Sequence, residues 1–182
     1  MGVVIAHHNS NLSQVLDDVR HCEKEAKKLP DKNAFSIVLA KRAGGTEYIT
    51  AKWFYDNNPP FEKGGQGGIF ETIPLLRAWA DAFYNDHMSP KMVYTFRTET
   101  IGLENLEEKD AKKKLPAKAI ELELLRIAKR QWNKKKEKEF NEQAVKDLVG
   151  GIMNLHVAGG LSLDEISKFL SLAAFLGREG NR

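Results

Sequence analysis

The chain has a single cysteine, Cys22, among 182 residues, and it has no long apolar run. One cysteine excludes an internal disulfide and suits a reducing compartment. Because Cys22 falls within an amphipathic helical pattern, we expect a buried, unreactive thiol. No apolar stretch approaches the ~20 residues that a membrane-spanning helix needs. The polar residues after the first apolar stretch do not form a signal-peptide cleavage site, so we expect a cytoplasmic protein without a membrane partner.

The sequence also lacks a self-sufficient metal or catalytic pattern. His7 and His8 are neighbours on a predicted strand, so they point to opposite faces, and no zinc ligand follows at the usual spacing. One of them can still lie beside a ligand at the end of the strand, with a structural histidine as the alternative. Asp17 and Asp18 point about 100° apart on a helix, which favours a solvated face. We predict no catalytic residue and no metal ligand in this chain.

Charge of one sign is not in excess overall, since 28 Lys and Arg face 25 Asp and Glu for a net charge of +3. That balance does not predict nucleic-acid binding, but the basic residues are clustered. The densest cluster runs from Arg126 to Lys138 and contains Trp132, so it could follow a phosphate backbone while a base stacks on the aromatic ring. The alternative is a solvated helix end that favours cations. The candidate RNA-binding residues are Lys129, Arg130, Lys134 and Lys135.

Residues 1–55 predict the order strand, helix, strand, strand. An apolar strand covers Gly2 to Ala6, and the helix that follows carries the apolar stripe Leu12, Val15, Leu16, Val19, Cys22 and Ala26. Pro30 stops this helix, and a Gly44-Gly45 turn joins the strands Ala34 to Ala40 and Glu47 to Trp53 into a hairpin. The strand Gly2 to Ala6 is apolar at nearly every position. We therefore expect it to be covered on both faces and to need a neighbouring strand that this chain does not supply.

Residues 56–68 (DNNPPFEKGGQGG) predict a linker, because paired prolines and glycines extend neither helix nor strand. GGQGG lacks the Lys-Ser/Thr pair of a phosphate-binding loop. Residues 69–182 predict a bundle of four or five helices, the last opened by a Ser162–Glu165 capping box. The first expected helix carries Ile69, Ile73, Leu76, Ala80 and Phe83 on one face, and a short helix starts at Ser89-Pro90. A charged connector is expected over 99–115, and further helices are expected to start at Pro116 and Phe140.

Four segments resemble, in order, the C-terminal part of the large palm-domain subunit of type III-B CRISPR effector complexes (Cmr type). GVVIAHH with NLSQVL (2–16) resembles the strand and helix after that family's active-site hairpin, and AFSIVLAKRAGG (34–45) resembles its next strand and turn. ELLRIAKRQ (123–131) and KFLSLAAFLGRE (168–179) resemble its C-terminal helical domain. The resemblance implies an α+β fold: a truncated ferredoxin-like palm (β-α-β-β), similar to GGDEF-type nucleotide cyclases, followed by an all-helical domain.

The resemblance also implies a chemistry. The family converts ATP into cyclic oligoadenylate when the complex engages target RNA, and the aspartates of a GGDD hairpin hold divalent Mg or Mn ions. This chain contains no GGDD, so we expect that hairpin upstream of Gly2 and expect the chain alone to be inactive. One lysine carries over. Glu25-Ala26-Lys27 matches an Ala-Lys that approaches nucleotide phosphates in cyclase-like palms, which makes Lys27 a candidate nucleotide contact together with His7. The alternative for Lys27 is a solvated lysine.

We therefore expect an assembly role that supports a nucleotide site whose metal-binding half lies elsewhere. The partners implied by the resemblance are the N-terminal part of the same subunit, the small helical and other subunits of the complex, and the guide and target RNA. Two other functions stay open, namely a stand-alone RNA-binding helical module and a catalytically inert regulator that binds a nucleotide.

Overall fold

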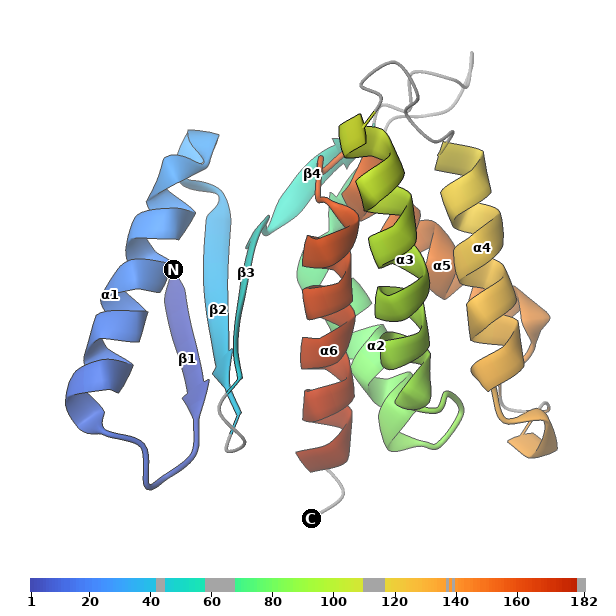
Figure 1. Cartoon of the computed structure of the whole chain (residues 1–182), viewed down its shortest axis with the longest axis horizontal. Helices are drawn as coiled ribbons and strands as arrows, with labels where there is room; N and C mark the ends of the chain where they lie inside the picture. The colour runs from blue at the N-terminus through green and yellow to red at the C-terminus, as the bar shows by residue number, and fades with distance from the viewer. Residues whose placement is uncertain (42–44, 58–67, 110–116, 137, 139, 180–182) are drawn as a thin grey trace. The chain divides into compact units, whose positions relative to one another are not determined.

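A computed structural model of the chain describes residues 1–41, 45–57, 68–109, 117–136, 138 and 140–179. The described residues divide into two compact units, Met1–Thr72 and Ile73–Arg182, which we call the sheet unit and the helical unit (Figure 1). The fold is mixed α and β, with a three-stranded and a two-stranded sheet followed by helices.

The main sheet of the sheet unit has the strand order β1-β2-β3. β1 (Gly2–Ala6) lies parallel to β2 (Ala34–Ala40), which pairs antiparallel with β3 (Thr46–Lys52). Helix α1 (Leu12–Lys28) connects the two parallel strands and packs on one face of the sheet (Figure 1). The predicted strand, helix, strand, strand order is confirmed. The helix also ends where Pro30 predicted, since Pro30 opens the short 3₁₀ turn η1 (Pro30–Lys32).

A second, antiparallel pair joins β4 (Phe54–Asn57) to β5 (Gly68–Glu71), with Phe54 opposite Glu71. These strands take the two ends of the predicted linker, and residues 58–67 lie outside the described part of the chain. The placement of Ile69 on a helix is wrong. Its backbone pairs with Asp56 on β4, and a pairing between distant residues is invisible to a local helical pattern.

Two predictions for α1 are also wrong. Leu12 and Leu16, expected to face the sheet, are 70% and 46% exposed, whereas Asp18, expected in solvent, is 7% exposed. The buried face is Asp18, Cys22 and Ala26, spaced four residues apart. Asp18 is compensated there by hydrogen bonds from Tyr48 Oη (3.0 Å) and Gln14 Nε2 (3.1 Å). The stripe read from hydrophobicity alone is therefore rotated from the real contact face.

The helical unit contains five described α-helices: α2 (Thr72–Tyr84), α3 (Lys91–Lys109), α4 (Ala117–Gln131), α5 (Glu142–Val157) and α6 (Leu163–Glu179). Helix α3 packs on α4 and α6, and α4 packs on α5. A Cβ atom on Gly177 of α6 would lie 2.7 Å from the Ala80 carbonyl oxygen, so α6 and α2 touch through a glycine. The helical second half is thus confirmed from α2 onward. Fully buried side chains from four of its helices include Trp79, Phe96, Leu124, Ile127 and Phe169.

The helix boundaries follow the sequence signals in one place and depart from them in another. The capping box is confirmed, since Glu165 N donates to Ser162 Oγ and Ser162 N donates to Glu165 Oε2. The charged connector is wrong over 99–109, because α3 continues to Lys109. Glu, Leu and Lys are good helix formers, so charge alone does not end a helix. Residues 110–116, including Pro116, lie outside the described part.

Candidate functional site

The outer side of β1 is the most distinctive surface of the sheet unit. β1 is at the end of the strand order, and among the described strands it pairs only with β2. Met1 points its backbone at β2, because its N-terminal ammonium donates to Ala34 O (2.9 Å) and its carbonyl accepts from Ser36 N (2.8 Å). Residues of a parallel strand alternate in direction, so the N–H and C=O groups of Gly2, Val4 and Ala6 point away from β2. These six groups are the β1 edge.

The exposed leucines of α1 lie along this edge. A Cβ atom on Gly2 would lie 2.8 Å from both Val19 O and Glu23 N, so the start of β1 lies directly beneath that part of α1. Leu12 and Leu16 share the helix side of Val19, at spacings of seven and three residues. They therefore follow β1 toward its other end, and we call the pair the α1 ledge. All five residues of β1 are half-buried, so this apolar strand also keeps part of its surface exposed to solvent.

On its other side, α1 is connected to β3 by a polar network around Asp18. Asp18 accepts the Tyr48 hydroxyl, and the His21 ring meets the Tyr48 ring edge-on with centroids 5.1 Å apart. Burial and the Asp18 hydrogen bond raise the pKa of Tyr48. Burial also raises the pKa of the fully buried Cys22 thiol, and the structure confirms the predicted buried cysteine. This network connects α1 to β3.

His7 and His8 lie just beyond the carboxyl end of β1. Their rings are 4.2 Å apart, and the backbone amide of Asn9 donates to His7 Nδ1 at 3.2 Å. His7 thus closes a local turn through one ring nitrogen, which in the neutral ring places the proton on Nε2. Asn11 caps α1 by accepting from Ser13 N. His7 therefore has a structural role in this turn and also lies at the end of β1.

Lys27 lies at the other end of α1, about 22 Å from the His7 end at 1.5 Å per helical residue. Its Nζ is 2.7 Å from Glu23 Oε1, and its side chain is 71% exposed. The hydrogen bond from Lys27 lowers the pKa of Glu23. The two candidate nucleotide contacts are therefore not brought together, and one phosphate group cannot touch both.

The four candidate RNA-binding residues lie at one end of the helical unit. Lys129 and Arg130 are in the last turn of α4, and Lys134 and Lys135 follow in the 3₁₀ turn η2 (Lys134–Lys136). Lys129 Nζ is 2.6 Å from Glu142 Oε1 on α5, so its charge is paired. Arg130, Lys134 and Lys135 are exposed and form no ion pair within 4 Å among the described residues, although the charge of Arg130 helps to lower the pKa of Glu123.

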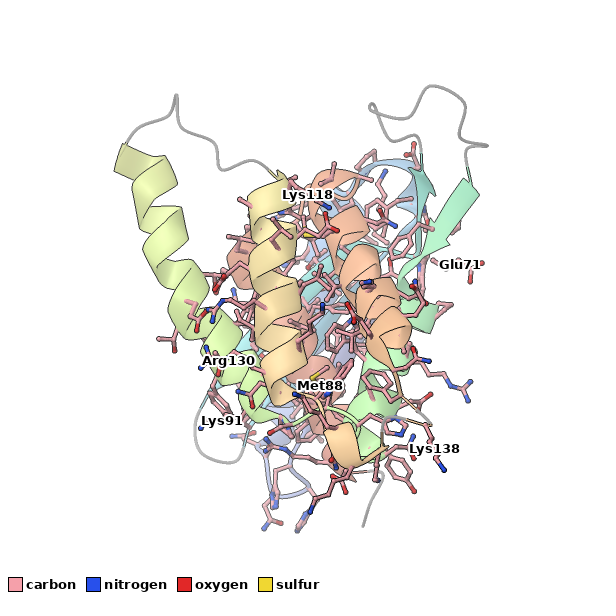
Figure 2. The ribbon with its side chains drawn as sticks, turned by 90° about the vertical axis from the view of Figure 1, so that its right-hand side faces the viewer. Glu71, Met88, Lys91, Lys118, Arg130 and Lys138 are labelled. Carbon is pink, nitrogen blue, oxygen red and sulfur yellow. The ribbon has the colours of Figure 1, made fainter. Side chains whose placement is uncertain are left out.

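Sequence reasoning missed two contributors to these surfaces. Lys91, the first residue of α3, is exposed and lies at the same end of the helical unit as Arg130 (Figure 2). Tyr94, one turn further along α3, is 65% exposed. A single lysine and a single tyrosine carry no pattern that could have singled them out. The described residues hold no group of three or more His, Cys, Asp or Glu side chains that could bind a metal ion. Among them there is also no helix with the length and apolar character needed to cross a membrane.

No protein-family model, curated protein or solved structure matches the chain.

Proposed function

We propose that the chain is the C-terminal part of the large palm-domain subunit of a type III-B CRISPR effector complex, and that the β1 edge receives a strand from the N-terminal part of that subunit. The observation that carries the proposal is the β1 edge itself, flanked by the exposed α1 ledge. Two further observations support the proposal: the β-α-β-β order of the sheet unit and the resemblance of the four sequence segments to that family.

The unpaired groups of the β1 edge are a liability for the chain alone. A strand with unpaired N–H and C=O groups and apolar side chains is a template for another strand. Gly2, Val4 and Ala6 offer these groups. Leu12 and Leu16 stand beside them, and complete burial of a leucine is worth about 1.5–3 kcal/mol. An added strand that carries apolar residues at alternate positions would satisfy the hydrogen bonds and cover the ledge together.

In this proposal the catalytic metal site lies outside the chain. The added part contributes the GGDD hairpin, which holds divalent Mg or Mn ions and ATP, and the assembled palm makes cyclic oligoadenylate. Lys27 can exchange its ion pair with Glu23 for a phosphate group, since an exposed pair is worth only about 0–1 kcal/mol. His7 lies too far from Lys27 to serve the same phosphate, so we assign only one of them to the nucleotide. The helical unit docks the small helical subunit of the complex in the cytoplasm.

Substitutions at Val4 test the strand docking. The Val4 N–H faces away from β2, so Val4→Pro removes a donor from the β1 edge without removing a bond to β2. We would co-express the chain with the GGDD-containing segment encoded upstream and measure the complex by size-exclusion chromatography. Val4→Pro should abolish the complex, whereas Val4→Ala, which keeps the N–H, should form it. Equal complex formation by the wild type and by Val4→Pro would refute the docking.

Two further readouts separate docking from function. In the chain alone, hydrogen exchange at the Val4 and Ala6 amides should be fast, and it should slow in the complex because those amides become bonded. Full protection of these amides in the monomeric chain would contradict the proposal. The complex should convert ATP to cyclic oligoadenylate in the presence of Mn²⁺. A stable complex that leaves ATP unchanged would remove the enzymatic role while leaving the strand docking intact.

The two alternatives have separate supports. The exposed basic residues at the end of α4 favour an RNA-binding module. A nucleotide-binding regulator rests on Lys27 alone, and ATP-induced chemical-shift changes confined to the end of α1 would support it.

A further inference from the structure

The end of the helical unit where α4 finishes and α3 begins carries a group of exposed basic residues. Its members are Lys91, Arg130, Lys134 and Lys135, which we call the basic end. We propose that the basic end binds the phosphate backbone of single-stranded RNA and that Tyr94 stacks on a base of the same strand. This inference does not depend on the palm assembly, because all five residues lie in the helical unit.

Backbone pairing brings the basic end together from two distant segments. Met88, in the connection between α2 and α3, forms a β-bridge with Trp132. On either side of it, Ser89 N donates to Gln131 O (3.0 Å) and Asn133 N donates to His87 O (2.8 Å). The two segments run antiparallel, so Lys91 comes to lie beside the last turn of α4. Figure 2 shows Lys91, Arg130 and Met88 at the same end of the helical unit.

The charges of this surface differ from those of the neighbouring basic residues. Arg126 bonds to Glu99 and Glu123, and Lys129 to Glu142, so those cations are neutralised within the fold. Lys136 Nζ donates to the Asn85 carbonyl oxygen and holds η2 in place. The four residues of the basic end form no ion pair within 4 Å in the described part of the chain, and the charge of Arg130 acts on Glu123 only at longer range, where it helps to lower the Glu123 pKa. They therefore remain available to an external anion.

A solvated helix end explains only part of this arrangement. The carboxyl end of α4 favours Lys129 and Arg130, because the helix dipole is negative there. Lys91 is the first residue of α3, where the dipole is positive and disfavours a cation. Its placement beside Arg130 gathers like charges, which costs stability in the free protein. A polyanion that spans both helix ends would relieve this repulsion.

The exposed ring of Tyr94 points to RNA among the possible polyanions. It lies one turn beyond Lys91 and is 65% exposed, so it can stack on an unpaired base. Trp132, the aromatic residue inside the sequence cluster, is half-buried, and its Nε1 atom is enclosed by the protein. We therefore assign base stacking to Tyr94 on α3 and not to Trp132, which follows α4. An acidic protein surface would use the cations but would gain nothing specific from the tyrosine.

A binding measurement on the full chain tests the cationic contacts. We would titrate a fluorescein-labelled 20-nucleotide oligouridylate and record anisotropy between 50 and 200 mM KCl. Lys134→Gln/Lys135→Gln removes two phosphate contacts, which should weaken binding about 20-fold at 0.1 M salt and reduce the salt slope by about 1.4. The matched control, Lys24→Gln/Lys32→Gln, makes the same charge change on exposed lysines of the sheet unit and should bind like the wild type.

A second pair of variants tests the stacking. Tyr94→Ala should weaken binding at least about fivefold with little change in salt slope, since it removes no charge. Phe54→Ala, which removes an exposed ring from the sheet unit, should have no effect. Equal losses in the lysine control would reduce the surface to general electrostatics and overturn the proposal. Absence of RNA binding at 50 mM salt would overturn the proposal as well. So would poly-glutamate binding that is as tight as RNA binding and is unchanged by Tyr94→Ala.

Discussion

The two units bury their apolar residues in different ways. In the helical unit, helices meet on several sides, and Trp79, Phe96 and Phe169 lose nearly all exposure to solvent. In the sheet unit, every residue of β1 stays half-buried, and Leu12 and Leu16 stand in water beside it. A helical bundle can close its own core because each helix satisfies its backbone internally. A sheet that ends on an apolar strand leaves hydrogen-bonding groups open, so the β1 side is where the sheet unit stays incompletely covered among the described residues.

The largest expected effect contrasts one buried and one exposed side chain. Phe169→Ala removes a fully buried ring from α6 and should lower the free energy of unfolding by about 3–5 kcal/mol. Leu16→Ala, on the α1 ledge, should change it by less than about 0.5 kcal/mol. Urea titrations followed by circular dichroism would measure both. A loss at Leu16 comparable to that at Phe169 would mean that the ledge is already covered in the free chain.

The next largest effect on stability comes from one glycine in each unit that packs closely against the backbone of a neighbouring element. Gly2→Ala and Gly177→Ala place a Cβ within 2.8 Å and 2.7 Å of backbone oxygens, so each should cost about 1–3 kcal/mol. Gly150→Ala on α5 is the control. No atom lies within 4 Å of its Cβ position, so it should stabilise the chain by about 0.5–1 kcal/mol through helix propensity. Thermal unfolding would show opposite shifts for Gly177→Ala and Gly150→Ala.

Tyr48→Phe tests whether the polar network holds α1 against β3. It removes the hydroxyl that donates to the buried Asp18 carboxylate and should cost about 1–2 kcal/mol, because Asp18 keeps only Gln14 as a partner. Hydrogen exchange in α1 should quicken, while the helices of the helical unit should be unaffected. The double variant Asp18→Asn/Tyr48→Phe should recover part of the loss. An unchanged exchange rate in α1 would show that the helix is held by its apolar face alone.

The smallest effect is a pH dependence of the helical unit. The hydrogen bond from Arg126 lowers the pKa of Glu123 to about 2 from 4.5. A carboxyl whose pKa is lowered on folding stabilises the protein above its unfolded pKa, so this stability is lost as the pH falls from about 4.5 to about 2. Arg126→Met should flatten that part of the pH profile, by less than about 1 kcal/mol because the pair is partly exposed. Identical profiles of stability against pH for the wild type and Arg126→Met would contradict this role of the Arg126–Glu123 pair.

Local sequence signals were sufficient for most of the elements. The alternation in Ala34–Ala40, the stop at Pro30 and the Ser162–Glu165 capping box act over a few residues, so the sequence alone predicted them. Interactions between distant segments were not predictable in this way. The backbone pairing of Ile69 with Asp56 depends on a contact that no short window contains. The continuation of α3 to Lys109 follows from helix propensity, which the charge pattern obscured.

The sequence by itself determined the order of strands and helices, the division into a sheet half and a helical half, and the clustering of cations around α4. Only the tertiary structure decided which face of α1 is buried, because Tyr48 of β3 makes Asp18 a better inward residue than Leu12 or Leu16. It also decided which cations are free. Glu99, Glu123 and Glu142 neutralise Arg126 and Lys129, while the bridge between Met88 and Trp132 brings Lys91 to the remaining charges. Both outcomes depend on residues far apart in the chain, whose contacts arise only when it folds.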